Sequence, residues 1–114
     1  MEFFDPSIEQ LVTEIIAVNH AWKEAKSLFN FPDTPLANSL RDLKARLQVR
    51  LLRKYAPENV YLMIDTNVNT DYDELLYGLQ LVTSVNGRRD AAHMPIRVAQ
   101  ENLSAQELEQ FVRS

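Results

Sequence analysis

The chain has 114 residues, 46% of them hydrophobic and 25% charged, which predicts one folded domain over residues 1–114 with its own core rather than a disordered segment. It contains no cysteine, which excludes disulfide bonds, thiolate metal sites and cysteine nucleophiles. The net charge of −4 disfavours nucleic acid and anionic membranes as partners, and the lack of a signal-peptide pattern or a membrane-length apolar run predicts a soluble, cytoplasmic protein.

Residues 7–29 are expected to form a first long helix. Their apolar side chains recur alternately three and four residues apart, which is the spacing of a helix packed lengthwise on another helix. Asp5 is the expected N-cap, and Pro6 is the expected first helical residue because that position needs no backbone N–H. The helix is expected to end at the proline-containing connection 30–35.

The same helix carries candidate contacts for a second copy of the chain. Val12 and Ile16 widen its apolar stripe beyond a single seam, which indicates more than one packing partner. Asn19 falls inside the stripe, where a buried asparagine can fix register or oligomeric state; an asparagine at the stripe's edge would instead reach water. The expected homodimer seam is therefore Val12, Ile16 and Asn19.

Residues 35–55 are expected to form a second helix, antiparallel to the first because the connection is short. Thr34 and Pro35 supply an N-cap and a first helical residue, and Pro57 ends the helix. Apolar residues lie on two sides of this helix, which predicts that it is sandwiched between the first helix and a sheet.

The second helix also has a basic face. Arg46, Arg50 and Arg53 are spaced four and three residues apart and therefore share one side of the helix. A nucleic-acid-binding surface is the alternative functional interpretation, although no nucleic-acid motif accompanies the arginines. The face could equally be solvated, or it could meet the acids of the first helix within the hairpin or across a dimer. Those acids are Glu9, Glu14 and Glu24.

Three strands are expected next, at residues 60–66, 75–85 and 88–98. Asn86-Gly87 between the last two is the preferred pair for a two-residue type I′ turn. Folding the chain there pairs Val85 with Arg88 and Leu79 with Met94, and it places the apolar pairs on one face. Pro95 lacks an N–H, so the last strand should lie at an edge and residues 75–85 should be central.

The expected outer face of this sheet is polar and cationic. It would carry Gln80, Arg89, His93 and Arg97, and it could bind an acidic protein partner or a small anion. A solvated sheet face is the simpler alternative, because many antiparallel sheets leave one face in water. We take these four residues as the candidate partner-binding site.

A short helix is expected at the C-terminal end of the chain. Ser104 and Glu107 form a capping box, and Leu103 with Leu108 forms a hydrophobic staple, so the helix should run from about residue 105 to 113. The predicted fold class is α+β: an N-terminal antiparallel helical hairpin packed on a three-stranded antiparallel meander, followed by a short helix.

Motifs of catalysis and metal binding are weak. The acidic loop after residue 65 lacks the glycine and the glutamate that an EF-hand needs, and neither His20 nor His93 belongs to a metal-binding pattern. No nucleophile, base and orienting group can be assigned together, although a pocket beneath the loop 67–74 could serve a small enzyme or a ligand-binding domain. We therefore expect a non-enzymatic protein-interaction module, an accessory, adaptor or assembly factor that acts as a homodimer on a protein partner, without cofactor or metal.

Overall fold

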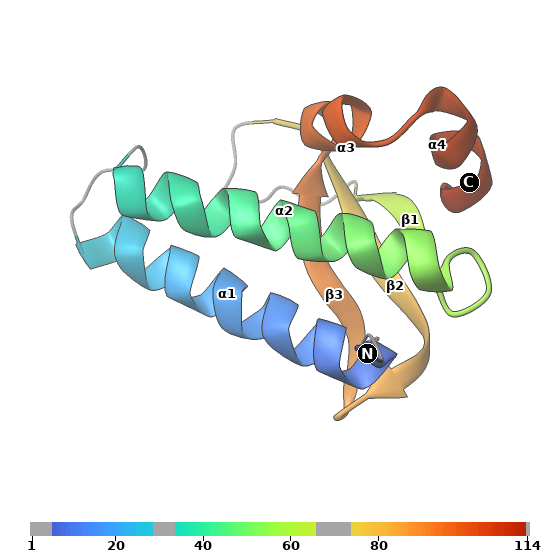
Figure 1. Ribbon diagram of the computed structural model, residues 1–114, viewed down its shortest axis with the longest axis horizontal. Coiled ribbons are helices and arrows are strands. Elements are labelled where there is room, and N and C mark those ends of the chain that lie inside the picture. The colour runs from blue at the N-terminus through green and yellow to red at the C-terminus, as the bar shows by residue number, and fades with distance from the viewer. Residues whose placement is uncertain (1–5, 29–33, 66–73, 114) are drawn as a thin grey trace, which may run out of the picture.

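The computed structural model describes residues 6–28, 34–65 and 74–113, which form the expected α+β fold (Figure 1). An antiparallel hairpin of two long helices precedes a three-stranded antiparallel sheet, and two short helices follow it. The elements are α1 (Ile8–Leu28), α2 (Pro35–Tyr55), β1 (Val60–Asp65), β2 (Leu76–Val85), β3 (Arg88–Pro95), α3 (Ile96–Asn102) and α4 (Ala105–Phe111).

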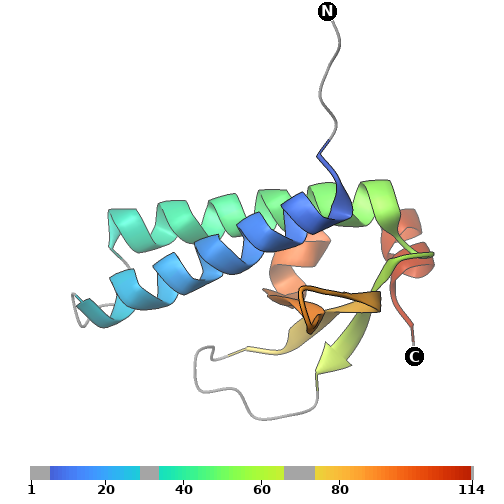
Figure 2. The same ribbon diagram turned by 90° about the horizontal axis from the view of Figure 1, so that it is seen from below.

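The described elements lie in two layers (Figure 2). α1 and α2 cover one face of the sheet, whereas α3 and α4 pack beside α2 at the ends of the strands (Figure 1). The core lies between the layers, where apolar side chains leave water and supply most of the stabilisation. Its fully buried members include Ile15, Leu51, Leu52, Leu62, Leu79 and Met94.

The helix starts follow local capping chemistry. α2 has the bounds predicted from the sequence, and the Thr34 hydroxyl accepts a hydrogen bond from the Ala37 N–H at 3.1 Å. α1 differs, because Ser7 and Gln10 cap each other reciprocally and Pro6 precedes the cap. The expectation that Pro6 begins the helix was therefore wrong, and Asp5 lies outside the described residues.

The strand order β1-β2-β3 confirms a meander with β2 central and β3 at an edge. The hairpin turn is also as predicted, since Asn86 and Gly87 both have positive φ and Val85 pairs with Arg88. Further along, the predicted pairing of Leu79 with Met94 is wrong, because Met94 lies opposite Tyr77.

Two irregularities cause this shift. Between the pairs Val85–Arg88 and Gln80–Asp90, β2 has three more residues than β3, and a bulge in β3 then takes back one of these before the pair Gly78–His93. Ala92 has φ 64°, and its N–H donates to the Asp90 carboxylate at 3.2 Å, which stabilises the left-handed turn. The register has moved by two residues where the strands pair again. Because side chains alternate with period two, this even shift keeps Tyr77 and Met94 on their predicted face, whereas Asp90, expected opposite Thr83, lies opposite Gln80 on the other face. Met94 and Leu79 therefore both remain buried beneath the helices.

The third strand is shorter than predicted. It ends at Pro95, and α3 begins at Ile96, whose N–H donates to the Leu75 carbonyl at 3.0 Å. The sequence from residue 96 to 102 contains good helix formers, and Arg97 pairs with Glu101 four residues on at 3.2 Å. The predicted strand extension to residue 98 was wrong for this reason.

The C-terminal segment closes against the first strand. The predicted capping box of α4 is confirmed, with Glu107 N–H donating to Ser104 Oγ at 3.1 Å and Ser104 N–H donating to Glu107 Oε1 at 3.0 Å. α4 ends at Phe111, earlier than expected, because Val112 forms a parallel bridge with Leu62 and the Arg113 N–H donates to the Leu62 carbonyl at 2.8 Å.

Neither long helix, nor any other helix among the described residues, combines the length and the apolar content that a membrane crossing requires.

Candidate functional site

The sheet face that points away from α1 and α2 contains a contact that spans all three strands. Gly78 of β2 lies between its partners Met63 on β1 and His93 on β3. With no side chain at Gly78, the imidazole of His93 reaches across β2 to the first strand. Its Nε2 donates to Oδ2 of Asp65 at 2.7 Å. Glycine in this central strand thus permits a cross-sheet hydrogen bond.

A hollow of about 500 Å³ opens around this contact. It offers two carboxylates, an amide and an imidazole beside two apolar side chains. Asp90 at its rim already accepts from Arg88 at 3.1 Å, and Asp65 accepts from His93. A carboxylate has about four acceptor positions, and the hydrogen bonds of Asp90 with Arg88 and the Ala92 N–H use three of them. The lining residues are Met63, Ile64, Asp65, Gly78, Gln80, Asp90 and His93.

The structure unites only half of the predicted partner-binding residues. Gln80 and His93 line the hollow together, as expected for one sheet face. Arg89 lies exposed on β3 outside the lining, and Arg97 belongs to α3 rather than to the sheet. The sheet face was expected to be cationic, but its hollow is lined by two carboxylates. It therefore suits a cationic group rather than an acidic one.

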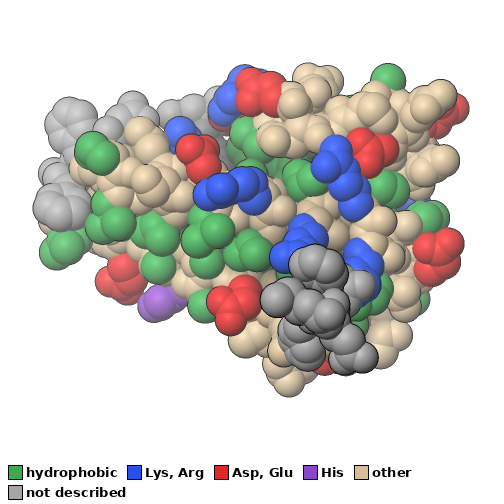
Figure 3. Space-filling view, viewed as in Figure 1, with side chains coloured by type: hydrophobic (Ala, Val, Ile, Leu, Met, Phe, Trp, Pro, Cys, Tyr) green, Lys and Arg blue, Asp and Glu red, His purple; other side chains and the backbone are tan. Residues whose placement is uncertain are grey.

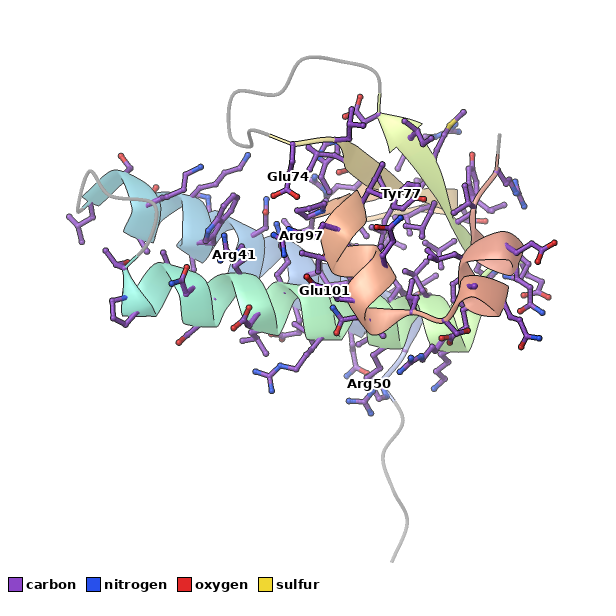
Figure 4. All side chains as sticks on the ribbon, turned by 90° about the horizontal axis from the view of Figure 1, so that it is seen from above. Arg41, Arg50, Glu74, Tyr77, Arg97 and Glu101 are labelled. Atoms are coloured by element: carbon purple, nitrogen blue, oxygen red, sulfur yellow. The ribbon has the colours of Figure 1, made fainter. Side chains whose placement is uncertain are left out.

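Arg97 serves a different contact. Its guanidinium lies between two acids, with Nε 3.3 Å from Glu74 Oε1 and Nη1 3.2 Å from Glu101 Oε1 (Figure 4). The hydrogen bonds to Glu74 and then to Glu101 raise the pKa of Arg97. This network ties α3 to Glu74, two residues before β2, so it supports the fold rather than a sheet-face site.

The three arginines of the alternative nucleic-acid face do share one surface. Arg46, Arg50 and Arg53 line a hollow of about 480 Å³ with Lys54 and Asn102. Arg53 is engaged within the protein, because it donates to the Asn102 carbonyl at 3.0 Å and forms a forked pair with Glu107. Arg50 instead projects away from the sheet into solvent (Figure 4).

The ion pair between Arg53 and Glu107 keeps the Glu107 carboxyl ionised to lower pH. The side-chain hydrogen bond from Arg53, followed by the backbone hydrogen bond from Ser104, lowers the pKa of Glu107 from 4.5 to about 2. A carboxyl whose pKa is lower in the folded state stabilises that state above its ordinary pKa, and this stabilisation is lost as the pH falls towards 2.

We expect Arg53→Ala to raise the pKa of Glu107 towards its ordinary value, because the largest cause of the shift is removed. An NMR titration of the Glu107 side chain measures it directly. The matched control is Arg50→Ala, one turn away on the same helix, which should leave the titration unchanged. An unchanged Glu107 pKa in the Arg53 variant would contradict the role of this ion pair.

The predicted homodimer seam lies largely inside the protomer. Val12 is buried in the core, and Ile16 is half-buried and packs against it. Asn19 accepts a hydrogen bond at 3.1 Å from Lys44, which is 1% exposed and lies 4.5 Å from the ring centroid of Trp22. The asparagine therefore fixes how α1 lies on α2, and Val12 is out of reach of a second copy.

Sequence reasoning missed Gln48, a fully buried glutamine on α2. Its Nε2 donates to the carbonyls of Ala91 and His93 at 3.0 and 3.1 Å, so α2 anchors the bulged part of β3. Within the described residues its Oε1 has no hydrogen-bond partner. The available signal was a polar residue at the spacing of the buried stripe, four residues after Lys44 and three before Leu51.

No cluster of three or more potential metal-ligating side chains occurs in ranges 6–28, 34–65 and 74–113. The loop considered for calcium, and for a pocket beneath it, lies mostly outside these ranges. Comparison of the chain with known protein families, with curated proteins and with solved structures gave no match.

Proposed function

We propose that this chain is a small non-enzymatic protein-interaction module that acts as a homodimer, and that the sheet-face hollow receives a lysine or arginine side chain of a partner protein. The observation that carries the proposal is the His93–Asp65 contact across Gly78, which opens a hollow lined by carboxylates on a rigid sheet. A binding site for one side chain of a partner protein is compatible with an accessory, adaptor or assembly role.

The chemistry of the lining supports a basic side chain. Carboxylates of Asp65 and Asp90 and the Gln80 amide oxygen can accept hydrogen bonds from an ammonium or a guanidinium group. Met63 and Ile64 are 44% and 52% exposed, so they can cover the methylene stem of such a residue. An acidic ligand would instead meet the like charges of Asp65 and Asp90.

The same lining favours binding over catalysis. A histidine beside an aspartate can orient and activate a nucleophile, but the lining residues that the structure describes include no serine, threonine, cysteine or lysine that could take that role. The His93–Asp65 pair is therefore explained more simply as an orienting contact that holds the carboxylate in place.

We expect wild-type protein to select displayed random peptides enriched about tenfold in lysine or arginine at one position. Gly78→Val should abolish the selection, because its side chain fills the hollow and separates His93 from Asp65. The fold should tolerate this change: a Cβ at Gly78 meets the flexible Gln80 Nε2 at 3.1 Å and His93 Cδ2 at 3.8 Å.

Arg89→Ala, on the same sheet but outside the lining, is the control. Enrichment of acidic peptides, or equal selection by Gly78→Val, would overturn the proposal.

A second candidate function is nucleic-acid binding at the hollow of Arg46, Arg50 and Arg53, favoured by their convergence on one surface. Fluorescence anisotropy with a labelled DNA of random sequence tests it. The expected result is an affinity that falls steeply with salt and is lost in Arg50→Glu, with Arg89→Glu as the control. No binding at about 50 mM salt would exclude this function.

A further inference from the structure

The outer face of the helical hairpin carries two parallel stripes of side chains, all exposed except one half-buried alanine. On α1 they are Glu14, the half-buried Ala21 and Leu28, and on α2 they are Leu36, Leu43 and Arg50. Residues seven apart return to the same side of a helix, so each stripe runs straight along its helix. Leu28, Leu36 and Leu43 are 76%, 52% and 37% exposed, and hydrophobic side chains gather over α1 and α2 on this face (Figure 3).

The two stripes match in level. The hydrogen bond from Lys44 to Asn19 fixes the position of one helix along the other. Counting from it along the antiparallel pair places Leu28, Ala21 and Glu14 within one residue of the levels of Leu36, Leu43 and Arg50, respectively. Each stripe is apolar at the turn end of the hairpin and charged towards the other end, acidic on α1 and basic on α2.

The charged ends of the stripes have no ion-pair partner among the residues that the structure describes, and both ends, Glu14 and Arg50, are exposed. The acidic end of the α1 stripe and the basic end of the α2 stripe lie at about the same level. A second copy of this face, turned over, would therefore set each acid against a base and leucine against leucine. A two-fold axis parallel to the helices achieves this, because it lays each α1 stripe on the partner's α2 stripe.

We infer that a second copy of this chain docks on this face, with Glu14 against Arg50 of the partner subunit and the leucines packed towards the turn end of the hairpin. This inference rests on the homodimer in the proposed function and supplies the interface that the buried seam at Val12 cannot. A two-fold axis perpendicular to the helices would lay the two α1 stripes on each other in opposite directions and set each Glu14 against an apolar end, so charge pairing selects the parallel axis.

The size of the face indicates how tightly two copies should associate. Two helices of 21 residues, each about 30 Å long and about 10 Å wide, present about 600 Å² per copy. Specific interfaces bury roughly 800 Å² per partner, so this face suits a modest, concentration-dependent dimer. We expect light scattering on a sizing column to show a mass that rises from 13.2 kDa towards twice that value at tens of micromolar.

A charge exchange tests the arrangement. Glu14→Arg and Arg50→Glu should each weaken dimerisation about tenfold, because each places like charges in contact, and the double variant should restore it. Leu43→Glu should dissociate the dimer, and Arg89→Glu on the sheet should have no effect. Circular dichroism checks that each variant remains folded.

The possible failures are separable. A monomeric mass for the wild type at all concentrations would overturn the homodimer of the proposed function and this interface with it. A wild-type dimer that survives Leu43→Glu and both single charge changes would leave the homodimer standing but place its interface elsewhere. Peptide selection by the sheet-face hollow is measured independently of both outcomes.

Discussion

Replacing Leu79 by alanine is expected to lower the free energy of unfolding by about 2–5 kcal/mol, the range for truncating a fully buried leucine. Leu79 lies on the central strand opposite Leu62 and is 0% exposed, with α1 and α2 packed above the sheet. Neighbours on both strands are held by their backbone ladders, so the cavity can collapse only partly. Urea denaturation followed by circular dichroism measures the change.

Val82→Ala is the matched control, since Val82 lies on the same strand but is 48% exposed. It should change stability by less than about 0.5 kcal/mol. Equal losses for the two variants would contradict the placement of Leu79 between sheet and helices, and with it the assignment of inner and outer faces.

Replacing Gln48 by leucine is expected to cost about 2–4 kcal/mol, although the side chain becomes more hydrophobic. The carbonyls of Ala91 and His93 would lose their donor, and each unsatisfied buried acceptor costs about 1–3 kcal/mol. Loss of the unpartnered Oε1 offsets a small part of this cost. The NMR signals of the His93 ring should also move, because the anchor of its backbone is gone.

Gln106→Leu provides the control for that change, because Gln106 is exposed on α4 and should tolerate leucine. Urea denaturation of the two variants isolates the contribution of the buried hydrogen bonds. A Gln48 variant as stable as the wild type, with unmoved His93 signals, would show that α2 does not hold the bulged strand.

Elements defined by local chemistry could be predicted from the sequence. α2 begins at Thr34 and Pro35 and ends before Pro57, and the hairpin turn follows from Asn86-Gly87, because each signal acts within a few residues. The bulge at Ala92 could not be foreseen, since alanine gives no hint of a positive φ. It depends on the Asp90 carboxylate and on the buried Gln48 of a distant helix.

The candidate site was predicted only in part for a similar reason. Gln80 and His93 could be assigned to one face from strand periodicity alone. Asp65 and Asp90 enter the hollow because a glycine lets His93 cross β2 and because the irregular pairing of β2 with β3 brings Asp90 opposite Gln80. Both effects are tertiary, so the sequence pattern predicted a cationic face where the structure has an acidic hollow.

The bridge between Val112 and Leu62 has a consequence for how another chain can approach the sheet. Its backbone contacts occupy part of the free side of β1, while the left-handed residue Ala92 and Pro95 interrupt the free side of β3. Exposed strand edges are the usual templates for intermolecular β-pairing and aggregation. Here both are obstructed, so main-chain augmentation of the sheet is disfavoured and selectivity rests with side chains.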